Sequence, residues 1–188
     1  MVPGWEDSWR SFHRSVRAGG LWIGPPWESA PEGEPTVVID PGRAFGTGAH
    51  PTTRAAIELL AHIPRGSVLD AGCGSGVLAI AAARLGFGRV VAVDVDAVAV
   101  EVARENAVAN AVSVEVRRAN VLAGELPQAD VVVANIELAV VERLLGSVTT
   151  PRAVVSGYLA GDRLDASGWR RIARVQIEGW VADSLVRA

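Results

Sequence analysis

The stretch Val68-Leu69-Asp70-Ala71-Gly72-Cys73-Gly74-Ser75-Gly76 decides the fold of this 188-residue chain. Its first two residues have the character of the end of a short buried strand, and residues 75–86 carry apolar side chains at helical spacing. Glycines at every second position fill the turn between them. Because glycine has no Cβ atom, the backbone of such a turn can press against a ligand. The stretch therefore predicts a cofactor-binding turn at the carboxyl end of a strand in an α/β sheet, with Asp70 at the strand tip.

Strand and helix patterns alternate on both sides of this turn. Helical spacing predicts further helices over residues 52–62, 97–110, 137–145 and 159–168. Short apolar runs predict strands over residues 37–39, 89–94, 114–117, 129–135 and 153–156, followed by a closing antiparallel pair over residues 172–177 and 180–186. The alternation predicts a doubly wound parallel sheet with helices on both faces.

Residues 1–35 differ from the rest of the chain. They hold four of the six tryptophans (Trp5, Trp9, Trp22 and Trp27) and several closely spaced prolines. The pattern predicts a helix over residues 6–17 and a short strand over residues 21–23 before a Pro-Pro break. We interpret residues 1–35 as an extension that packs on a main domain of residues 36–188. Aromatic packing explains the tryptophans, and a surface that docks a partner is the alternative.

Composition argues against several classes of protein. A net charge of −3 speaks against a general nucleic-acid-binding surface, which needs a basic face. The longest apolar run, residues 90–100, is broken by Asp94 and Asp96 and is too short to cross a bilayer. We therefore expect neither nucleic acid nor membrane as a partner.

With one cysteine and no visible signal peptide, we expect a reducing, cytoplasmic location. The chain has no lysine, which excludes a P-loop and a Schiff-base lysine.

The glycine spacing indicates which cofactor the turn binds. Asp-x-Gly-x-Gly-x-Gly, with the acid before the glycines, is the pattern of S-adenosylmethionine (SAM) binding loops. A dinucleotide fingerprint would need a glycine where Val77 stands. Asp94 ends the next strand about 20 residues further on, where its carboxylate can accept both ribose hydroxyls. The sequence thus predicts SAM, held by Asp70, Gly72, Gly74 and Asp94. NAD binding and a purely structural turn are the alternatives.

Asn135 ends the strand expected beside the glycine turn. From there its side-chain amide would face the methyl group of the cofactor. An amide oxygen can hold a nucleophilic amine and aim its lone pair at the methyl carbon, and this alignment supplies much of the rate of a methyl transfer. Asn135 is therefore the predicted catalytic residue. The alternative is a helix N-cap for the segment from Glu137 onward.

Four segments resemble the ribosomal protein L11 methyltransferase family, a family of SAM-dependent protein methyltransferases. They are Phe45-Gly46-Thr47-Gly48-Ala49-His50-Pro51-Thr52-Thr53, Val68 to Ala82, Val93-Asp94-Val95-Asp96 and Val131-Val132-Val133-Ala134-Asn135-Ile136. The first segment is highly specific to the family, whereas the glycine turn alone would indicate only a SAM methyltransferase. The resemblance runs from about Trp9 to the C-terminus. It implies the class I SAM methyltransferase fold, a doubly wound, mostly parallel seven-stranded sheet with a reversed last strand.

The resemblance also assigns roles to individual residues. The residues that match SAM contacts of the family are Thr53, Gly72 and Asp94, of which Asp94 would hold the ribose. Asn135 matches the asparagine that lies beside the methyl group and the target amine. Phe45 and Thr47 would belong to a loop that closes over the cofactor, and its glycines would let it move.

Several other residues have a structural interpretation. His50 fits a residue that orders the turn before the helix, although its chemistry would also suit a general base. Cys73 fits a small residue that fills a tight turn, and Phe45 is suited to anchoring the core as well as to closing a loop. His13 and His62 have no companions at metal-ligand spacing, so we predict no metal site.

Two departures from the family bear on the substrate. Full-length members carry a separate N-terminal substrate-recognition domain, and the resemblance indicates a form without it. Where the family continues Asn-Ile-Leu-Ala, this chain has Glu137 after Ile136, and the carboxylate either complements a helix dipole or attracts a cationic substrate. The prediction is N-methylation of a protein amino group, a lysine side chain or an α-amine, with ribosomal protein L11 as one candidate substrate. A small-molecule amine substrate and a catalytically silent SAM-binding module are the alternatives.

Overall fold

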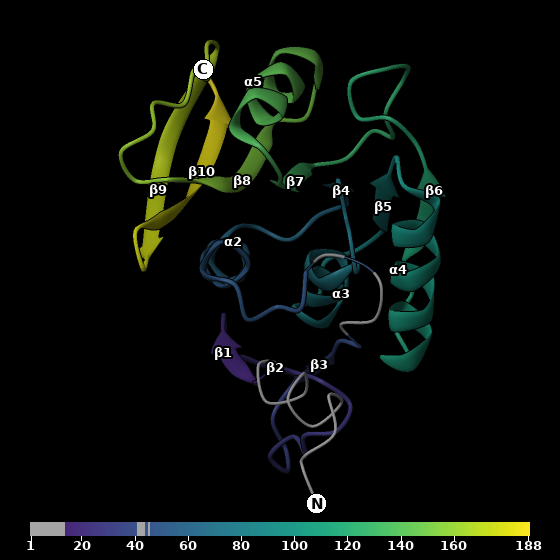
Figure 1. Ribbon diagram of the computed structural model, residues 1–188. Helices are drawn as coiled ribbons and strands as arrows, with labels where there is room; N and C mark the ends of the chain where they lie inside the picture. The colour runs from purple at the N-terminus through teal and green to yellow at the C-terminus, as the bar shows by residue number, and fades with distance from the viewer. Residues whose placement is uncertain (1–13, 41–43, 45) are drawn as a thin grey trace, which may run out of the picture.

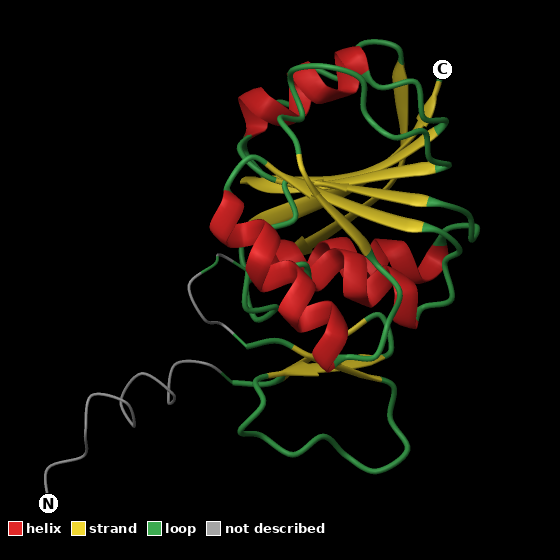
Figure 2. Ribbon diagram, turned by 90° about the vertical axis from the view of Figure 1, so that its right-hand side faces the viewer, coloured by secondary structure: helices red, strands yellow, loops and turns green. Residues whose placement is uncertain are grey.

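The computed structural model describes residues 14–40, 44 and 46–188. A seven-stranded sheet lies at its centre with helices on both faces, and a small three-stranded sheet lies beyond the helices of one face (Figure 2). The layered arrangement is the α/β architecture that the alternating pattern predicts.

The large sheet has the strand order β6-β5-β4-β7-β8-β10-β9, which can be followed from right to left in Figure 1. Its strands are β4 (Val68–Ala71), β5 (Val90–Asp94), β6 (Glu115–Arg118), β7 (Val131–Asn135), β8 (Arg152–Leu159), β9 (Trp169–Ile177) and β10 (Trp180–Arg187). The strands from β6 to β8 run parallel, and β10 is antiparallel to both of its neighbours. The predicted seven-stranded sheet with a reversed last strand is confirmed. Because β4 lies between β5 and β7, the glycine turn follows a strand whose neighbours end at Asp94 and Asn135.

Two hydrophobic cores fill the spaces between the sheet and its helices. Strand β7 shows how the sequence builds both: Val131 and Val133 belong to one core, while Val132 and Ala134 belong to the other. All four are fully buried. A central parallel strand is covered on both faces, and it therefore reads as a continuous apolar run rather than an alternating one.

In the described part of the chain, three helices cover one face of the sheet and a fourth covers the other (Figure 2). They are α2 (Pro51–His62), α3 (Val77–Arg84) and α4 (Ala97–Ala109) on the first face, and α5 (Leu138–Ser147) on the second. Helix α2 has a proline in its first turn, and the side chain of its N-cap His50 accepts a hydrogen bond from Thr52 N. Helix α3 begins two residues later than the pattern predicts, because Gly76 adopts a left-handed conformation at its N-cap.

The small sheet consists of β1 (Val16–Ala18), β2 (Leu21–Gly24) and β3 (Thr36–Val38). Strand β2 confirms the strand expected over residues 21–23, and its Trp22 is buried. Strand β3 comes from the other side of residue 35 and pairs with β2 in parallel, so both parts of the chain contribute to this sheet. The division into an extension of residues 1–35 and a domain of residues 36–188 stays a prediction.

Two of the expected helices need correction. Strand β8 continues to Leu159, and residues 160–168 form turns and loop rather than the helix predicted over 159–168. The Asp162 carboxylate accepts a hydrogen bond from Leu159 N, a local bond that competes with helix formation. Of the helix predicted over 6–17, residues 6–13 lie outside the described part of the chain. Residues 14–17 are not helical, since β1 begins at Val16 and pairs with β2.

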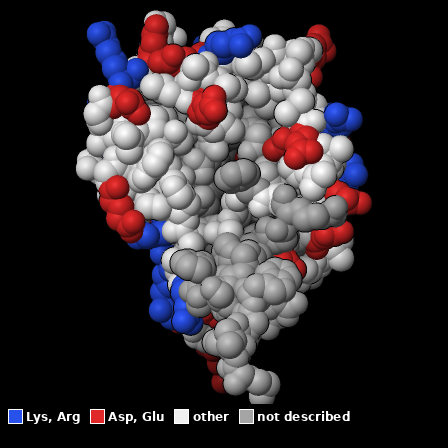
Figure 3. Space-filling model, in the orientation of Figure 1, with Lys and Arg blue, Asp and Glu red and all other residues white. Residues whose placement is uncertain are grey.

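The surface in the view of Figure 3 carries acidic and basic side chains scattered around its rim, with a small basic group at the lower left. The distribution matches a chain whose charges nearly balance. Among the helices that the structure describes, none is long and apolar enough to cross a membrane.

Candidate active site

The glycine turn after β4 is folded against the end of β5. The amides of Gly72 and Cys73 both donate to the carbonyl oxygen of Val93, at 2.8 and 3.0 Å. Gly72 has a φ of +81°, and a Cβ atom there would lie 2.6 Å from Cγ2 of Ile136. Both the backbone conformation and the lack of space require glycine at position 72.

Asp94 fixes the other side of the turn. Its Oδ2 accepts the amide of Gly74 at 2.9 Å and its Oδ1 accepts the amide of Asp96 at 3.0 Å. Each carboxylate oxygen can accept a second hydrogen bond. Asp94 is only partly buried and lines a cavity, so these remaining acceptor positions are accessible to a ligand.

Asp70 lies beneath the turn rather than in a cavity lining. Its side chain is buried, with 1% exposed, and its Oδ2 accepts the amide of Ala79 in helix α3 at 3.0 Å. Its Oδ1 has no hydrogen-bond partner among the described residues. Burial raises the pKa of Asp70 to about 7; the Ala79 amide opposes this shift and the nearby Asp94 carboxylate adds to it. Asp70 therefore ties the strand tip to the helix, and its predicted contact with a cofactor stays a prediction.

The raised pKa of Asp70 predicts a pH dependence of stability. The native state keeps the proton up to about pH 7, whereas the unfolded chain releases it near pH 3.8. The native state binds more protons in this window, so Asp70 lowers the free energy of unfolding as pH rises from 4 to 8, by up to about 4 kcal/mol. Urea denaturation of the wild type and of Asp70→Asn should show this decline in the wild type alone. Equal slopes in the two proteins would rule out Asp70 as its source.

Two cavities adjoin at the glycine turn and share Gly72, Gly74, Asn135 and Ile136. The first, which we call the α2-side cavity, has a volume of about 450 Å³. Its other lining residues include Thr47, His50, Thr53, Val77, Gly157 and Trp180. The second, the Asp94-side cavity, has a volume of about 640 Å³. Its other lining residues include Asp94, Val95, Asn120, Leu122, Glu137 and Val140.

Asn135 stands where the two cavities meet. Its Nδ2 donates to the hydroxyl of Thr53 at 3.1 Å, across 82 positions of sequence. Thr53 is buried, so its hydroxyl is a fixed support for the amide. Asn135 is not a helix N-cap: that position in α5 belongs to Glu137, whose side chain makes no capping hydrogen bond. The alternative role for Asn135 as a cap is therefore wrong.

The structure also places most of the other predicted site residues. Thr47 lines the α2-side cavity, whereas Phe45 lies outside the described residues. His50 lines the same cavity and caps α2, in agreement with its structural interpretation. Burial raises the pKa of the Cys73 thiol, with a further contribution from Asp70, so this cysteine stays protonated and unreactive at neutral pH. Within the described part of the chain, no cluster of three or more potential metal ligands occurs.

Gly157 and Trp180 are among the residues of the α2-side cavity that sequence reasoning missed. Gly157 has a φ of +107°, and a Cβ atom there would lie 2.1 Å from the carbonyl oxygen of Ile136. The single glycine inside strand β8 is the sequence feature that could have indicated this contact, since glycine inside a strand often marks a close backbone approach.

Glu137 lines the Asp94-side cavity and not the α2-side one. This carboxylate therefore lies on the same side of the site as Asp94.

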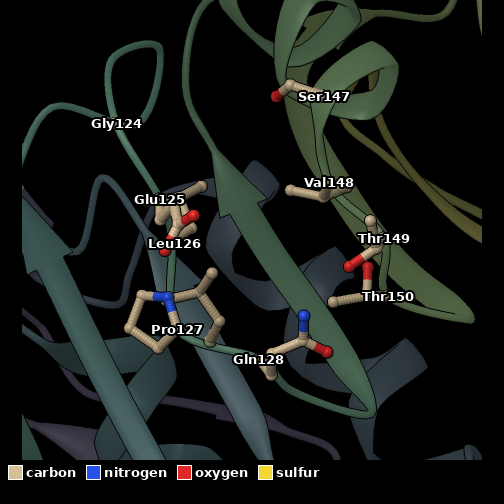
Figure 4. Close-up of a pocket in the computed structure, with 10 residues that line it drawn as sticks. Gly124, Glu125, Leu126, Pro127, Gln128, Ser147, Val148, Thr149 and Thr150 are labelled. Atoms are coloured by element: carbon tan, nitrogen blue, oxygen red, sulfur yellow. The ribbon is translucent and has the colours of Figure 1, made fainter.

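Another cavity, of about 390 Å³, lies where the chain enters β7 and β8, and it is shown in Figure 4. It is lined by residues 124–128 before β7 and residues 147–150 before β8, together with Leu69. These segments precede the strands, whereas the glycine turn, Asp94 and Asn135 lie at strand carboxyl ends. Ligands of open α/β sheets bind at the carboxyl ends, so we assign the site to the two adjoining cavities.

Comparison with known proteins matches this chain to a family. The family model for ribosomal protein L11 methyltransferase (PrmA) matches residues 3–182. A ribosomal protein L11 methyltransferase of Myxococcus xanthus is 39% identical over 97% of this chain and 67% of its own length. Across eight of the curated relatives that it matches, the chain spans between 45% and 67% of their length.

Solved structures agree with the sequence matches. The crystal structure of a ribosomal protein L11 methylase from Lactobacillus delbrueckii subsp. bulgaricus superposes with a TM-score of 0.81 at 26% identity, covering 93% of this chain and 98% of that one. A Pyrococcus abyssi tRNA (uracil-54, C5)-methyltransferase in complex with S-adenosyl-L-homocysteine shares the fold, with a TM-score of 0.65 at 19% identity, over 93% of this chain and 44% of that one. The glycine turn, the Asn135–Thr53 pair and these matches lead to one assignment: the chain belongs to the ribosomal protein L11 methyltransferase family.

Proposed function

We propose that the chain is a SAM-dependent N-methyltransferase acting on a protein amino group, a lysine side chain or an α-amine, in the cytoplasm. Ribosomal protein L11 is the first substrate to test, because the relatives carry its name. The observation that carries the proposal is the position of Asn135, held by Thr53 at the junction of two cavities beside a glycine turn.

The described residues fit SAM. The Asp94-side cavity combines a carboxylate that has free acceptor positions with apolar side chains such as Val95 and Leu122, a combination that suits a ribose and an adenine ring. The Asp94 carboxylate, which lines the cavity, favours a ligand that carries positive charge. When bound, SAM supplies an electrophilic methyl group on a sulfonium.

The chain's own residues then orient the acceptor amine. Thr53 accepts one N–H of the Asn135 amide and so limits its rotation, which leaves the amide oxygen to accept an N–H of the amine and direct its lone pair. The amine must be neutral to react. Apolar side chains of the α2-side cavity, among them Val77, Ile136 and Trp180, disfavour the charged form and lower the pKa of an ammonium group that enters.

Transfer of a radioactive methyl group from labelled SAM tests the proposal. The purified chain is incubated with ribosomal protein L11, and separately with free lysine and n-butylamine. We expect label in the protein, located by mass spectrometry on an amino group. Label in the small amines alone would replace the protein substrate by a small molecule, and no transfer to any acceptor, with SAM bound, would support a catalytically silent module.

The Thr53–Asn135 hydrogen bond predicts a specific rate effect. Thr53→Val removes the acceptor and leaves the Asn135 Nδ2 donor unpaired, so kcat should fall about fivefold to tenfold. Thr53→Ser keeps the hydroxyl and should stay within about twofold of the wild type. Steady-state kinetics with labelled SAM measures both. If the valine variant were as fast as the serine variant, Thr53 would not orient Asn135.

A further inference from the structure

The hairpin between β9 and β10 turns on two residues that both have left-handed backbone. Glu178 has a φ of +52° and Gly179 a φ of +83°, values typical of a type I′ turn. Glycine, which has no Cβ atom, and asparagine and aspartate, whose short side chains tolerate the conformation, are the usual residues at the first of these positions. Glutamate is not among the residues that this turn favours, so turn formation does not explain Glu178. A backbone outlier of this kind calls for a role of the side chain.

The side chain of Glu178 reaches across to helix α2. Its Oε1 accepts a hydrogen bond from Nη1 of Arg54 at 3.0 Å, in an ion pair that joins positions 124 apart in sequence. Arg54 follows Thr53, which supports Asn135. The ion pair therefore ties the tip of the hairpin to the first turn of the helix that carries this support.

Trp180, two residues after Glu178, is the hairpin's contribution to the α2-side cavity. Its ring makes an edge-to-face contact with His50, the N-cap of α2, with the ring centroids 5.0 Å apart. The backbone of the hairpin tip is held by β8, since Trp180 pairs with Leu159 and the amide of Ala160 donates to the carbonyl oxygen of Gly179 at 2.8 Å. The Trp180 side chain is only partly buried, so the position of its indole over α2 also depends on side-chain contacts. Among the described residues, Arg54–Glu178 and His50–Trp180 make such contacts between the hairpin tip and α2.

We infer that Arg54 and Glu178 are positioning residues that hold Trp180 as a wall of the acceptor-binding cavity, and so set the affinity for the acceptor amine. The inference rests on the proposed function. Neither residue lines the two cavities, so both act through Trp180. The pair should influence the KM for the acceptor and leave the chemical step and the affinity for SAM nearly unchanged.

Glu178→Asn is the most direct test, because its expected effect on stability is opposite in sign to its expected effect on acceptor binding. An Asn-Gly turn is better suited to the left-handed conformation, so the melting temperature should rise. The ion pair is lost, so the KM for ribosomal protein L11 should rise about fivefold, the size that a surface ion pair can account for. We expect kcat and the KM for SAM to change less than about twofold. Charge reversal in the double variant Arg54→Glu/Glu178→Arg should restore the acceptor KM.

A second readout does not depend on activity. The indole N–H resonance of Trp180, identified by its loss in Trp180→Phe, should move in Glu178→Asn and return in the charge-reversed double variant. An unchanged acceptor KM, an unmoved resonance, or an equal loss in kcat and SAM affinity would each overturn the inference. If the wild type methylated no acceptor at all, the proposed function would fail, and the resonance would still show whether the pair positions Trp180.

Discussion

Replacing Asn135 by alanine is expected to lower kcat by about 100-fold to 1,000-fold, since misalignment of an acceptor and its reacting centre costs a rate factor of this order. The substitution removes the amide that Thr53 holds and that we place beside the acceptor. It removes little of either cavity lining, so the affinity for SAM should change less than about threefold. Single-turnover transfer of labelled methyl measures the rate, and isothermal titration calorimetry measures the affinity.

Asn120→Ala is the matched control for this variant. Asn120 lines the Asp94-side cavity alone, so the same truncation there should raise the KM for SAM and leave kcat nearly unchanged. Equal kinetic effects of the two variants would mean that Asn135 has no special place in the methyl transfer.

Among the proposed substitutions, Gly157→Ala is expected to lower the free energy of unfolding the most. The new Cβ atom would lie 2.1 Å from the carbonyl oxygen of Ile136, and the backbone has a φ of +107°. Strain of the left-handed conformation and overpacking together should lower the free energy of unfolding by about 3 kcal/mol. Because the turn after Asn135 must also move, methyl transfer should fall with it. Differential scanning calorimetry should show a melting temperature roughly 10 °C lower.

Gly161→Ala controls for the loss of a glycine in the same region. A Cβ atom at Gly161 would meet no atom within 4 Å, and its φ lies outside the left-handed range. The melting temperature of this variant should match the wild type or slightly exceed it. A wild-type melting temperature for Gly157→Ala would contradict the close approach of β8 to the Asn135–Ile136 turn.

Local patterns were enough to predict much of the fold. Each of three features depends on a few neighbouring residues, which determine the local backbone conformation or burial. These features are the glycine turn, the valine-rich run of β7 and the acid at the end of β5. The helix expected over residues 159–168 was wrong, because the same apolar spacing is also compatible with a loop. The hydrogen bond that Leu159 N donates to the Asp162 carboxylate favours the loop.

Contacts between distant parts of the chain could not be predicted in this way. The Asn135–Thr53 hydrogen bond and the approach of Gly157 to Ile136 depend on how helices and strands pack, and no local pattern records them. Asp70 combines both situations. The glycine motif identified it as a residue of the site, but only the packing shows that its carboxylate lies under the turn and accepts the amide of Ala79. The role of Glu178 is visible only once the hairpin is placed beside α2.

A crystal structure of the chain with S-adenosyl-L-homocysteine would test the central claim most directly. The account predicts that the nucleoside fills the Asp94-side cavity with its ribose on Asp94, and that the sulfur lies against Gly72 close to Asn135. Density for the ligand in the cavity of residues 124–128 and 147–150, or a glycine turn that makes no contact with it, would contradict the account.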